Sequence, residues 1–451
     1  MQYNLTKYKP GSFREILYIS LPLMMSLLSN TIMILTDRII LAHYSIDAVN
    51  AVATVINTIS VFNCAFVATA AIAEVLVGQF NGKREYKKVS SPVWQMLWWS
   101  LFSYILYIPC AFWGGHLLIP DAVYDSAYPF YFWIMLSGPV FAAVAAISSF
   151  YIGIGKTYIV TIAAVVANLI NIALDCVLIF GIDGYLDPMS SKGAGIATTI
   201  AQIVFLAILA GAFLTKENRK TYHTFNYKFD KKIFIACLKI GLPSTLNSFL
   251  LIGGWAVIAN YIAAYHENLL TAYNFGLTFY LFFLFYTDAL GKTTTTIVSN
   301  AIGANTLSVI PRMIKSATML HLIILLIVFV CTWCFSAEII ILFYGAHNNF
   351  STEDIHELTL ILRSLSLLFF FEGYMGIYSG ILLGGGDTRF ILITNIIATW
   401  IVTVIPCIIW LKYFPCKVSD LNIYLFPFYC LLVFLMYFMR YKTSNWIRFK
   451  I

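Results

Sequence analysis

Charge is scarce in this sequence, and the common catalytic motifs are missing. Lys, Arg, Asp and Glu make up 11% of the 451 residues, whereas a water-soluble globular protein is nearer a quarter charged. The GKT triplets at 155–157 and 291–293 lack the first glycine of a phosphate-binding loop, which would stand at Phe150 and Tyr286. HExxH and GxSxG motifs are absent, and the only CxxC, at 331–334, lies in an apolar run. These gaps exclude a soluble protein and argue against an enzyme, a bound cofactor and ATP-driven transport.

Apolar residues take the place of charge. They form 60% of the chain, and the mean hydropathy is +0.83. A helix needs roughly 20 apolar residues to cross a bilayer. The sequence therefore predicts an all-α membrane protein with twelve transmembrane helices, at about 15–41, 51–79, 93–119, 129–152, 157–182, 194–214, 233–264, 271–302, 317–344, 358–383, 389–412 and 421–440.

The distribution of Lys and Arg orients these spans. Most of the 28 basic residues lie at the termini, in the 2–3 loop and in the polar linker 215–232, all of which an even number of spans places on one side. Because cytoplasmic loops carry excess Lys and Arg, we expect both termini to be cytoplasmic. The net charge of +7 then reflects topology, with no need for nucleic acid as a partner.

The chain repeats its own plan. The stretch SLPLMM at 20–25 returns as GLPSTL at 241–246, and VGQFNGKRE at 77–85 returns as VSNAIGANT at 298–306, both 221 residues later. The sequence thus predicts two six-helix lobes related by an internal repeat. The expected divisions are an N-terminal lobe at 1–214, a cytoplasmic linker at 215–232, a C-terminal lobe at 233–440 and a cytoplasmic tail at 441–451.

One apolar span carries a polar stripe. Asn168, Asn171 and Asp175 are three and four residues apart, which puts them on one face of the helix 157–182. An ionisable group at membrane depth costs about 2.5–3.5 kcal/mol, so few persist there without a partner or a water-filled cavity. Carboxylate and amide oxygens can hold a proton or a hard cation. Interhelical hydrogen bonding by the amides is the structural alternative.

The second half lacks this stripe, because the repeat places Thr399, Val402 and Pro406 at the equivalent positions. A packing requirement shared by both lobes would not produce that difference, whereas a task performed by one lobe would. Asp37, in the first span, is expected to lie against the stripe.

Other deep charges allow several interpretations. Asp288 and Lys292 are four residues apart and predict an intrahelical pair. Glu372 has no partner within its own helix.

These motifs resemble the multidrug and toxic compound extrusion (MATE) family along about residues 10–440. The resemblance rests on DRIILAHYSIDAVNA in span 1, VGQFNG after span 2, GIGKT before span 5, and NLINIALDCVLIFG followed by KGAGIATTIAQ. VSNAIGAN and LLGGGDT carry it in the second lobe.

The resemblance implies secondary-active export of small organic compounds, often cationic, in exchange for H⁺ or Na⁺. It implies a cation-coupling site at Asp37, Asn171, Asp175 and Thr198, with Na⁺ possible at the first three. Glu372, Asp288 and Asn168 are candidates for a substrate or second ion site. Leu251 stands where the same branch often has Glu, which favours coupling in the N-terminal lobe. The chain is expected to be a multi-pass monomer in a bacterial inner membrane, in contact with lipid.

Two other functions fit the same composition. A lipid-linked glycan flippase of the same superfamily would need a strongly basic cavity, but only Arg38 and Lys292 are basic within the spans. A membrane-embedded transferase would need a His or Asp nucleophile near the membrane surface, and the seven His are scattered. A simple channel suits the one-sided polar stripe less well than alternating access does.

Overall fold

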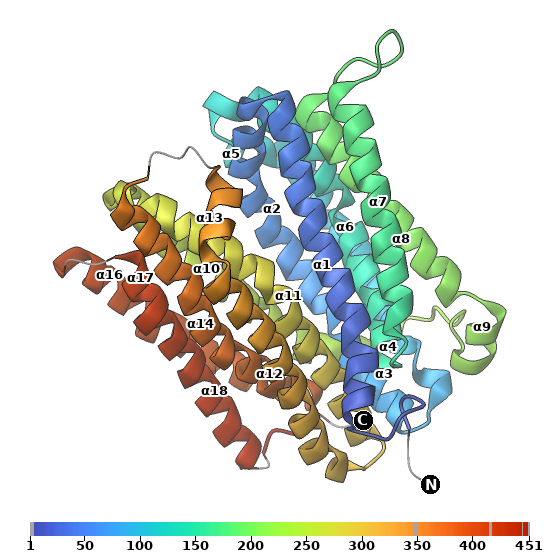
Figure 1. Cartoon of the computed structure of the whole chain (residues 1–451). Helices are drawn as coiled ribbons and strands as arrows, with labels where there is room; N and C mark the ends of the chain where they lie inside the picture. Colours follow the sequence, from blue (N-terminus) through green and yellow to red (C-terminus); the bar gives the residue numbers. More distant parts are fainter. Residues whose placement is uncertain (1–3, 346–349, 415–416, 444, 450–451) are drawn as a thin grey trace. The chain divides into compact units, whose positions relative to one another are not determined.

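The structure is a computed structural model that describes residues 4–345, 350–414, 417–443 and 445–449, so part of the predicted tail lies outside it. The helices of the first half run alongside one another (Figure 1). They are α1 (Phe13–Tyr44), α2 (Ile46–Ala71), α3 (Ala73–Gly82), α4 (Ser91–Pro109), α5 (Gly115–Leu118), α6 (Tyr124–Gly153), α7 (Thr157–Phe180) and α8 (Ser190–Phe213).

The second half follows a short helix in the linker, α9 (Lys216–Tyr222). Its helices are α10 (Lys231–Tyr265), α11 (Glu267–Gly303), α12 (Ile310–Cys334), α13 (Ser336–Tyr344), α14 (Thr352–Gly384), α15 (Thr388–Ile396), α16 (Ile405–Tyr413), α17 (Val418–Asp420) and α18 (Phe426–Lys442). Wider turns at 110–114, 397–404 and 421–425 join α4 to α5, α15 to α16 and α17 to α18. Single 3₁₀ turns lie at 86–88, 121–123 and 307–309.

Twelve helical stretches of the described chain are long and apolar enough to cross a membrane, which confirms the predicted fold class. One predicted boundary is wrong. The ninth span was expected at 317–344, but it covers Leu307–Cys334, and the helix breaks at Phe335 before α13 begins. Both sides of the break are apolar, so hydropathy alone does not detect the change of direction.

Contacts divide the chain into two compact units. The N-terminal unit contains Leu21–Thr245 and Ile302–Asn305, and the C-terminal unit contains the described residues up to Ser20, Leu246–Ala301 and the described residues from Thr306 onward. Two of the divisions fall close to prolines at equivalent places in the repeat, Pro22 in α1 and Pro243 in α10. The lobe bounds expected from the sequence stay predictions.

Small residues let helices pack closely within each unit. In the N-terminal unit α6 packs against α2, α4 and α8, and a Cβ on Gly138 would lie 2.1 Å from the Tyr107 ring of α4. A Cβ on Gly193, at the start of α8, would lie 2.7 Å from the Leu178 carbonyl of α7. Close approach of small residues is the usual basis of helix packing in membranes. The crossing at Gly193 brings α8 against the polar stripe of α7.

Candidate functional site

The polar stripe of α7 faces the protein interior. Asn171 and Asp175 are fully buried and Asn168 is nearly so, while Leu169 on the opposite face is 62% exposed. The rest of α7 is apolar, so the helix can place its outer face against lipid and its stripe against other helices.

Hydrogen bonds join the stripe to α1. Thr161 donates its hydroxyl to the carbonyl of Pro22 at 2.5 Å. Two turns further on, Asn168 donates to the Ser29 hydroxyl at 2.8 Å. The two helices are therefore held in register along the path that leads to Asp37.

Asn171 connects three helices. Its amide nitrogen donates to Asp37 Oδ1 of α1 at 3.0 Å, and its amide oxygen accepts from the backbone N–H of Thr198 in α8 at 3.3 Å. This orientation satisfies both ends of the amide, whereas the reverse would place like groups face to face. The structure thus brings together Asp37, Asn171, Asp175 and Thr198, the four residues predicted to form one site. Thr198 contributes its backbone N–H to this contact.

Asp37 and Asp175 form a carboxyl pair. Their side chains lie within hydrogen-bonding reach of one another. Asp175 is fully buried, and apart from the Asp37 carboxyl no hydrogen-bonding group among the described residues reaches either of its carboxylate oxygens. Two carboxylates this close together repel one another unless they share a proton or a cation. The pair is therefore a place where a small positive charge is stabilised.

No basic side chain neutralises this pair among the described residues, since neither Asp takes part in an ion pair. Arg38 directly follows Asp37, yet its side chain is exposed while that of Asp37 is half-buried. Successive residues on a helix point about 100° apart, as expected from the sequence. Groups of three or more His, Cys, Asp or Glu that could hold a metal ion are also absent from the described residues.

The C-terminal unit contains a different acid. Glu372 of α14 is buried and accepts a hydrogen bond from the Cys430 thiol of α18 at 3.0 Å. Asp288 of α11 lies within electrostatic range of Glu372, although its own side chain is exposed. The intrahelical ion pair expected between Asp288 and Lys292 is wrong: among the described residues their charged groups do not approach within salt-bridge distance. Both side chains are on the surface of the described chain, within the candidate span Leu269–Gly303.

Sequence reasoning missed a buried histidine beside Glu372. His321 of α12 is fully buried, and its Nε2 lies 3.2 Å from the carbonyl of Phe370. Its ring stacks on Tyr286 and occupies the space above Gly373, the residue after Glu372. In the sequence, the glycine that directly follows Glu372 is the signal that another helix could pack closely against α14 at this point.

The C-terminal counterpart of the stripe also differs in its backbone. Residues 397–404, which include Thr399 and Val402, form a widened helical turn just before Pro406. Proline removes a backbone N–H and clashes with the preceding turn, which accounts for the local widening. The asymmetry seen in the sequence is therefore an asymmetry of local structure as well.

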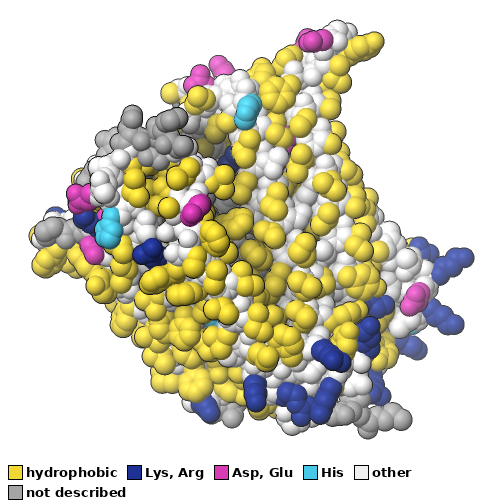
Figure 2. Space-filling model, in the orientation of Figure 1, with side chains coloured by type: hydrophobic (Ala, Val, Ile, Leu, Met, Phe, Trp, Pro, Cys, Tyr) yellow, Lys and Arg dark blue, Asp and Glu magenta, His cyan; other side chains and the backbone are white. Residues whose placement is uncertain are grey.

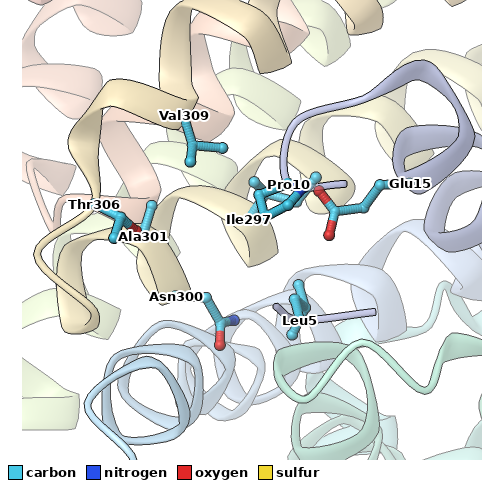
Figure 3. A pocket seen from close by; sticks show the side chains of 8 residues that line it. All are labelled: Leu5, Pro10, Glu15, Ile297, Asn300, Ala301, Thr306 and Val309. Atoms are coloured by element: carbon cyan, nitrogen blue, oxygen red, sulfur yellow. The ribbon is translucent and has the colours of Figure 1, made fainter. Parts of the chain in front are cut away.

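A small pocket lies at the N-terminal segment, within the C-terminal unit (Figure 3). Glu15 is buried there and accepts hydrogen bonds from the Gly11 N–H at 2.6 Å and the Thr6 hydroxyl at 3.2 Å. Gly11 has φ +71°, and its carbonyl accepts from the Ser316 hydroxyl at 2.8 Å. Glu15 thus holds the tight turn that docks the segment on α12. The pocket is lined by Leu5, Pro10, Glu15, Ile297, Asn300, Ala301, Thr306 and Val309.

Known proteins share both the sequence pattern and the fold. The chain is 23% identical over 429 residues to the "Probable multidrug resistance protein NorM" of Thermotoga maritima, covering 92% of this chain and 90% of that protein. It is 22% identical over 408 residues to the "Probable multidrug resistance protein YoeA" of Bacillus subtilis, covering 87% and 86%.

Solved structures match along nearly the whole chain. A "MATE in complex with MaL6" superposes with a TM-score of 0.86 at 17% identity, covering 98% of each chain. An "Outward-facing conformation of a multidrug resistance MATE family transporter of the MOP superfamily" gives 0.83 at 18% identity, covering 97% of each. The family model MatE matches residues 22–177 and again 243–409, in step with the internal repeat. Because these matches cover more than half of the sequence, this chain belongs to the MatE (MATE) family of transporters.

Proposed function

We propose that this chain is a secondary-active exporter of small organic compounds, driven by the inward movement of H⁺ or Na⁺ through the pair formed by Asp37 and Asp175. The observation that carries the proposal is this carboxyl pair, fully buried at Asp175 and half-buried at Asp37, which lacks a basic partner among the described residues. A pair of acids with only a structural role would destabilise the fold and add nothing to function. A coupling site, in contrast, needs such an unsatisfied charge. The names of the curated relatives support multidrug compounds as the substrate class.

Filling and emptying the pair would drive the conformational change. An ion entering from outside neutralises the two carboxyls and removes their mutual repulsion. The bridge through Asn171 then transmits the change to α1 and α8, because the same amide holds both. Ion binding must differ in strength between the two conformations, since a ligand that binds both equally shifts neither.

A proton fits the observed geometry better than Na⁺. Two carboxyl groups in hydrogen-bonding contact are stabilised by one shared proton. We therefore propose H⁺ as the coupling ion, with Na⁺ as the alternative outcome of the experiment below.

Two further assignments belong to the same proposal. The excess of Lys and Arg on one set of loops supports cytoplasmic termini. Glu372 and Asp288 would attract cationic substrates, since the two acids lie within electrostatic range and neither forms a salt bridge among the described residues.

Uptake of a cationic dye into inverted proteoliposomes tests the proposal, with pH or Na⁺ gradients imposed separately. We expect wild-type uptake to follow the pH gradient. Asp37→Asn and Asp175→Asn should abolish gradient-driven uptake, while Glu372→Gln should weaken dye affinity. Asp187→Asn, which removes an exposed acid in the loop after α7, is the matched control and should transport normally. Wild-type rates in Asp175→Asn would refute the coupling assignment, and uptake driven only by Na⁺ would replace the ion.

A further inference from the structure

The linker between the two halves is fastened along the start of a spanning helix. Five bonds from side chains of α4 and the residue before it reach the linker backbone. The Ser90 hydroxyl donates to the carbonyl of His223 at 3.1 Å. The indole N–H groups of Trp94 and Trp98 donate to the carbonyls of Thr224 and Tyr227 at 3.0 and 3.1 Å.

Gln95 supplies the other two bonds. Its amide nitrogen donates to the carbonyl of Lys228 at 3.1 Å, and its amide oxygen accepts from the N–H of Asp230 at 3.0 Å. Gln95 is fully buried, so this fastening is part of the packed structure. The linker therefore has a defined conformation with a defined outer surface.

The outer surface of the linker is aromatic. Phe225, Tyr227 and Phe229 are 59%, 56% and 49% exposed. Phe229 contacts Phe102, an exposed ring about three turns into α4, with ring centres 6.4 Å apart. Phe102 belongs to the candidate membrane span Tyr86–Leu118, so the linker lies alongside that span. Aromatic side chains are typical of the interfacial level of a bilayer.

The same segment is strongly basic. Residues 215–232 contain six Lys or Arg and only two acids. The basic residues are exposed, and the Arg219 guanidinium lies 4.8 Å from the centre of the Phe225 ring. Dark blue Lys and Arg side chains gather around α9 in Figure 2. Clusters of four to eight basic residues beside a membrane span are typical of binding to anionic headgroups.

We propose that the exposed linker residues Lys216, Arg219, Lys220, Phe225, Lys228 and Phe229 form a docking surface for anionic phospholipid headgroups at the bilayer interface. The rings enter the headgroup region while the cations bind the lipid phosphates. The rigid fastening to α4 keeps both sets of groups on one outward surface. This surface lies outside the carboxyl pair and does not depend on the proposed transport cycle.

Limited trypsin digestion in lipid nanodiscs tests the proposal, because the linker has several cleavage sites and nanodiscs leave both membrane faces accessible. Cleavage after Lys228 is followed by mass spectrometry, in phosphatidylcholine alone and with added phosphatidylglycerol. We expect about fivefold slower cleavage with the anionic lipid, and loss of that protection at high salt. Equal rates in the two lipids would overturn the proposal.

Two variants separate charge from aromatic anchoring, and both retain the Lys228 site. Lys216→Gln with Arg219→Gln and Lys220→Gln should remove the difference between the lipids. The matched control, Lys7→Gln with Lys9→Gln and Arg14→Gln, removes three exposed charges elsewhere and should keep the difference. Phe225→Ser with Phe229→Ser should raise cleavage in both lipids. Unchanged protection in both linker variants would refute the docking surface, provided that thermal unfolding shows them to be folded.

Discussion

Asn171 of α7 donates a hydrogen bond to Asp37 of α1 across 3.0 Å, and this bond makes an amide the link between the carboxyl pair and two neighbouring helices. In the proposed cycle the acids hold the charge. The amide determines which helices respond to it, because its oxygen also accepts from the backbone of Thr198 in α8. Coupling in this transporter is therefore expected to depend on Asn171 nearly as much as on the acids.

Replacing Asn171 by Leu should reduce gradient-driven dye uptake by about tenfold or more, because two hydrogen bonds of roughly 1 kcal/mol each are lost at the pair. Uptake in inverted proteoliposomes measures the effect. Asn168→Leu is the matched control, since it removes the same amide one turn earlier on the same face, where the partner is Ser29. A larger loss in Asn168→Leu than in Asn171→Leu would contradict this interpretation.

The ion pair made by the aspartate of the GGGDT motif is expected to raise the free energy of unfolding measurably. Asp387 is buried and its Oδ2 accepts from Arg440 Nε at 2.7 Å, which ties the turn before α15 to the end of α18. Arg440→Gln should lower the free energy of unfolding by about 2–4 kcal/mol, because it leaves the buried carboxylate with only the longer contact to Arg448, at 3.9 Å. Thermal unfolding in detergent reports the change. Adding Asp387→Asn to Arg440→Gln should recover most of the loss, and failure of this rescue would count against a charge effect.

Gly373 should tolerate no side chain. A Cβ there would lie 2.1 Å from the His321 ring, which is buried and stacked on Tyr286. Gly373→Ala is expected to cost about 1–3 kcal/mol through overpacking. The control is Gly211→Ala in α8, where nothing lies within 4 Å of the added Cβ and no destabilisation is expected. Equal melting temperatures for the two variants would show that the α12–α14 contact can relax.

Gln95 is expected to hold the linker against α4 in detergent as well as in lipid. Gln95→Leu removes the bonds to the Lys228 carbonyl and the Asp230 N–H, and leaves both groups to water. We expect about tenfold faster tryptic cleavage after Lys228, since two bonds of roughly 0.5–1.5 kcal/mol each are lost. Mass spectrometry of the fragments measures the rate. Cleavage at the wild-type rate would mean that the aromatic contacts alone hold the linker.

Local pattern was enough to predict the spans and the stripe. Hydropathy over about 20 residues identifies each span, and the helical period places Asn168, Asn171 and Asp175 on one face, because both signals depend only on neighbouring residues. The ninth span was misjudged because the break at Phe335 lies between two apolar segments. The expected pairing of Asp288 with Lys292 failed because helical spacing permits a contact without requiring it.

By itself, the sequence determined the membrane class, the repeated plan and the asymmetric polar stripe, since composition and period carry that information along the chain. Tertiary structure decided which groups meet: Asp37 with Asp175, Asn171 with the Thr198 backbone, Glu372 with Cys430, and Gln95 with the linker. These encounters join residues 27 to 138 positions apart in the chain. They depend on where helices cross, and close contacts such as that of Gly193 with Leu178 set these crossings. The pattern of neighbouring residues does not indicate which two residues will make such a contact.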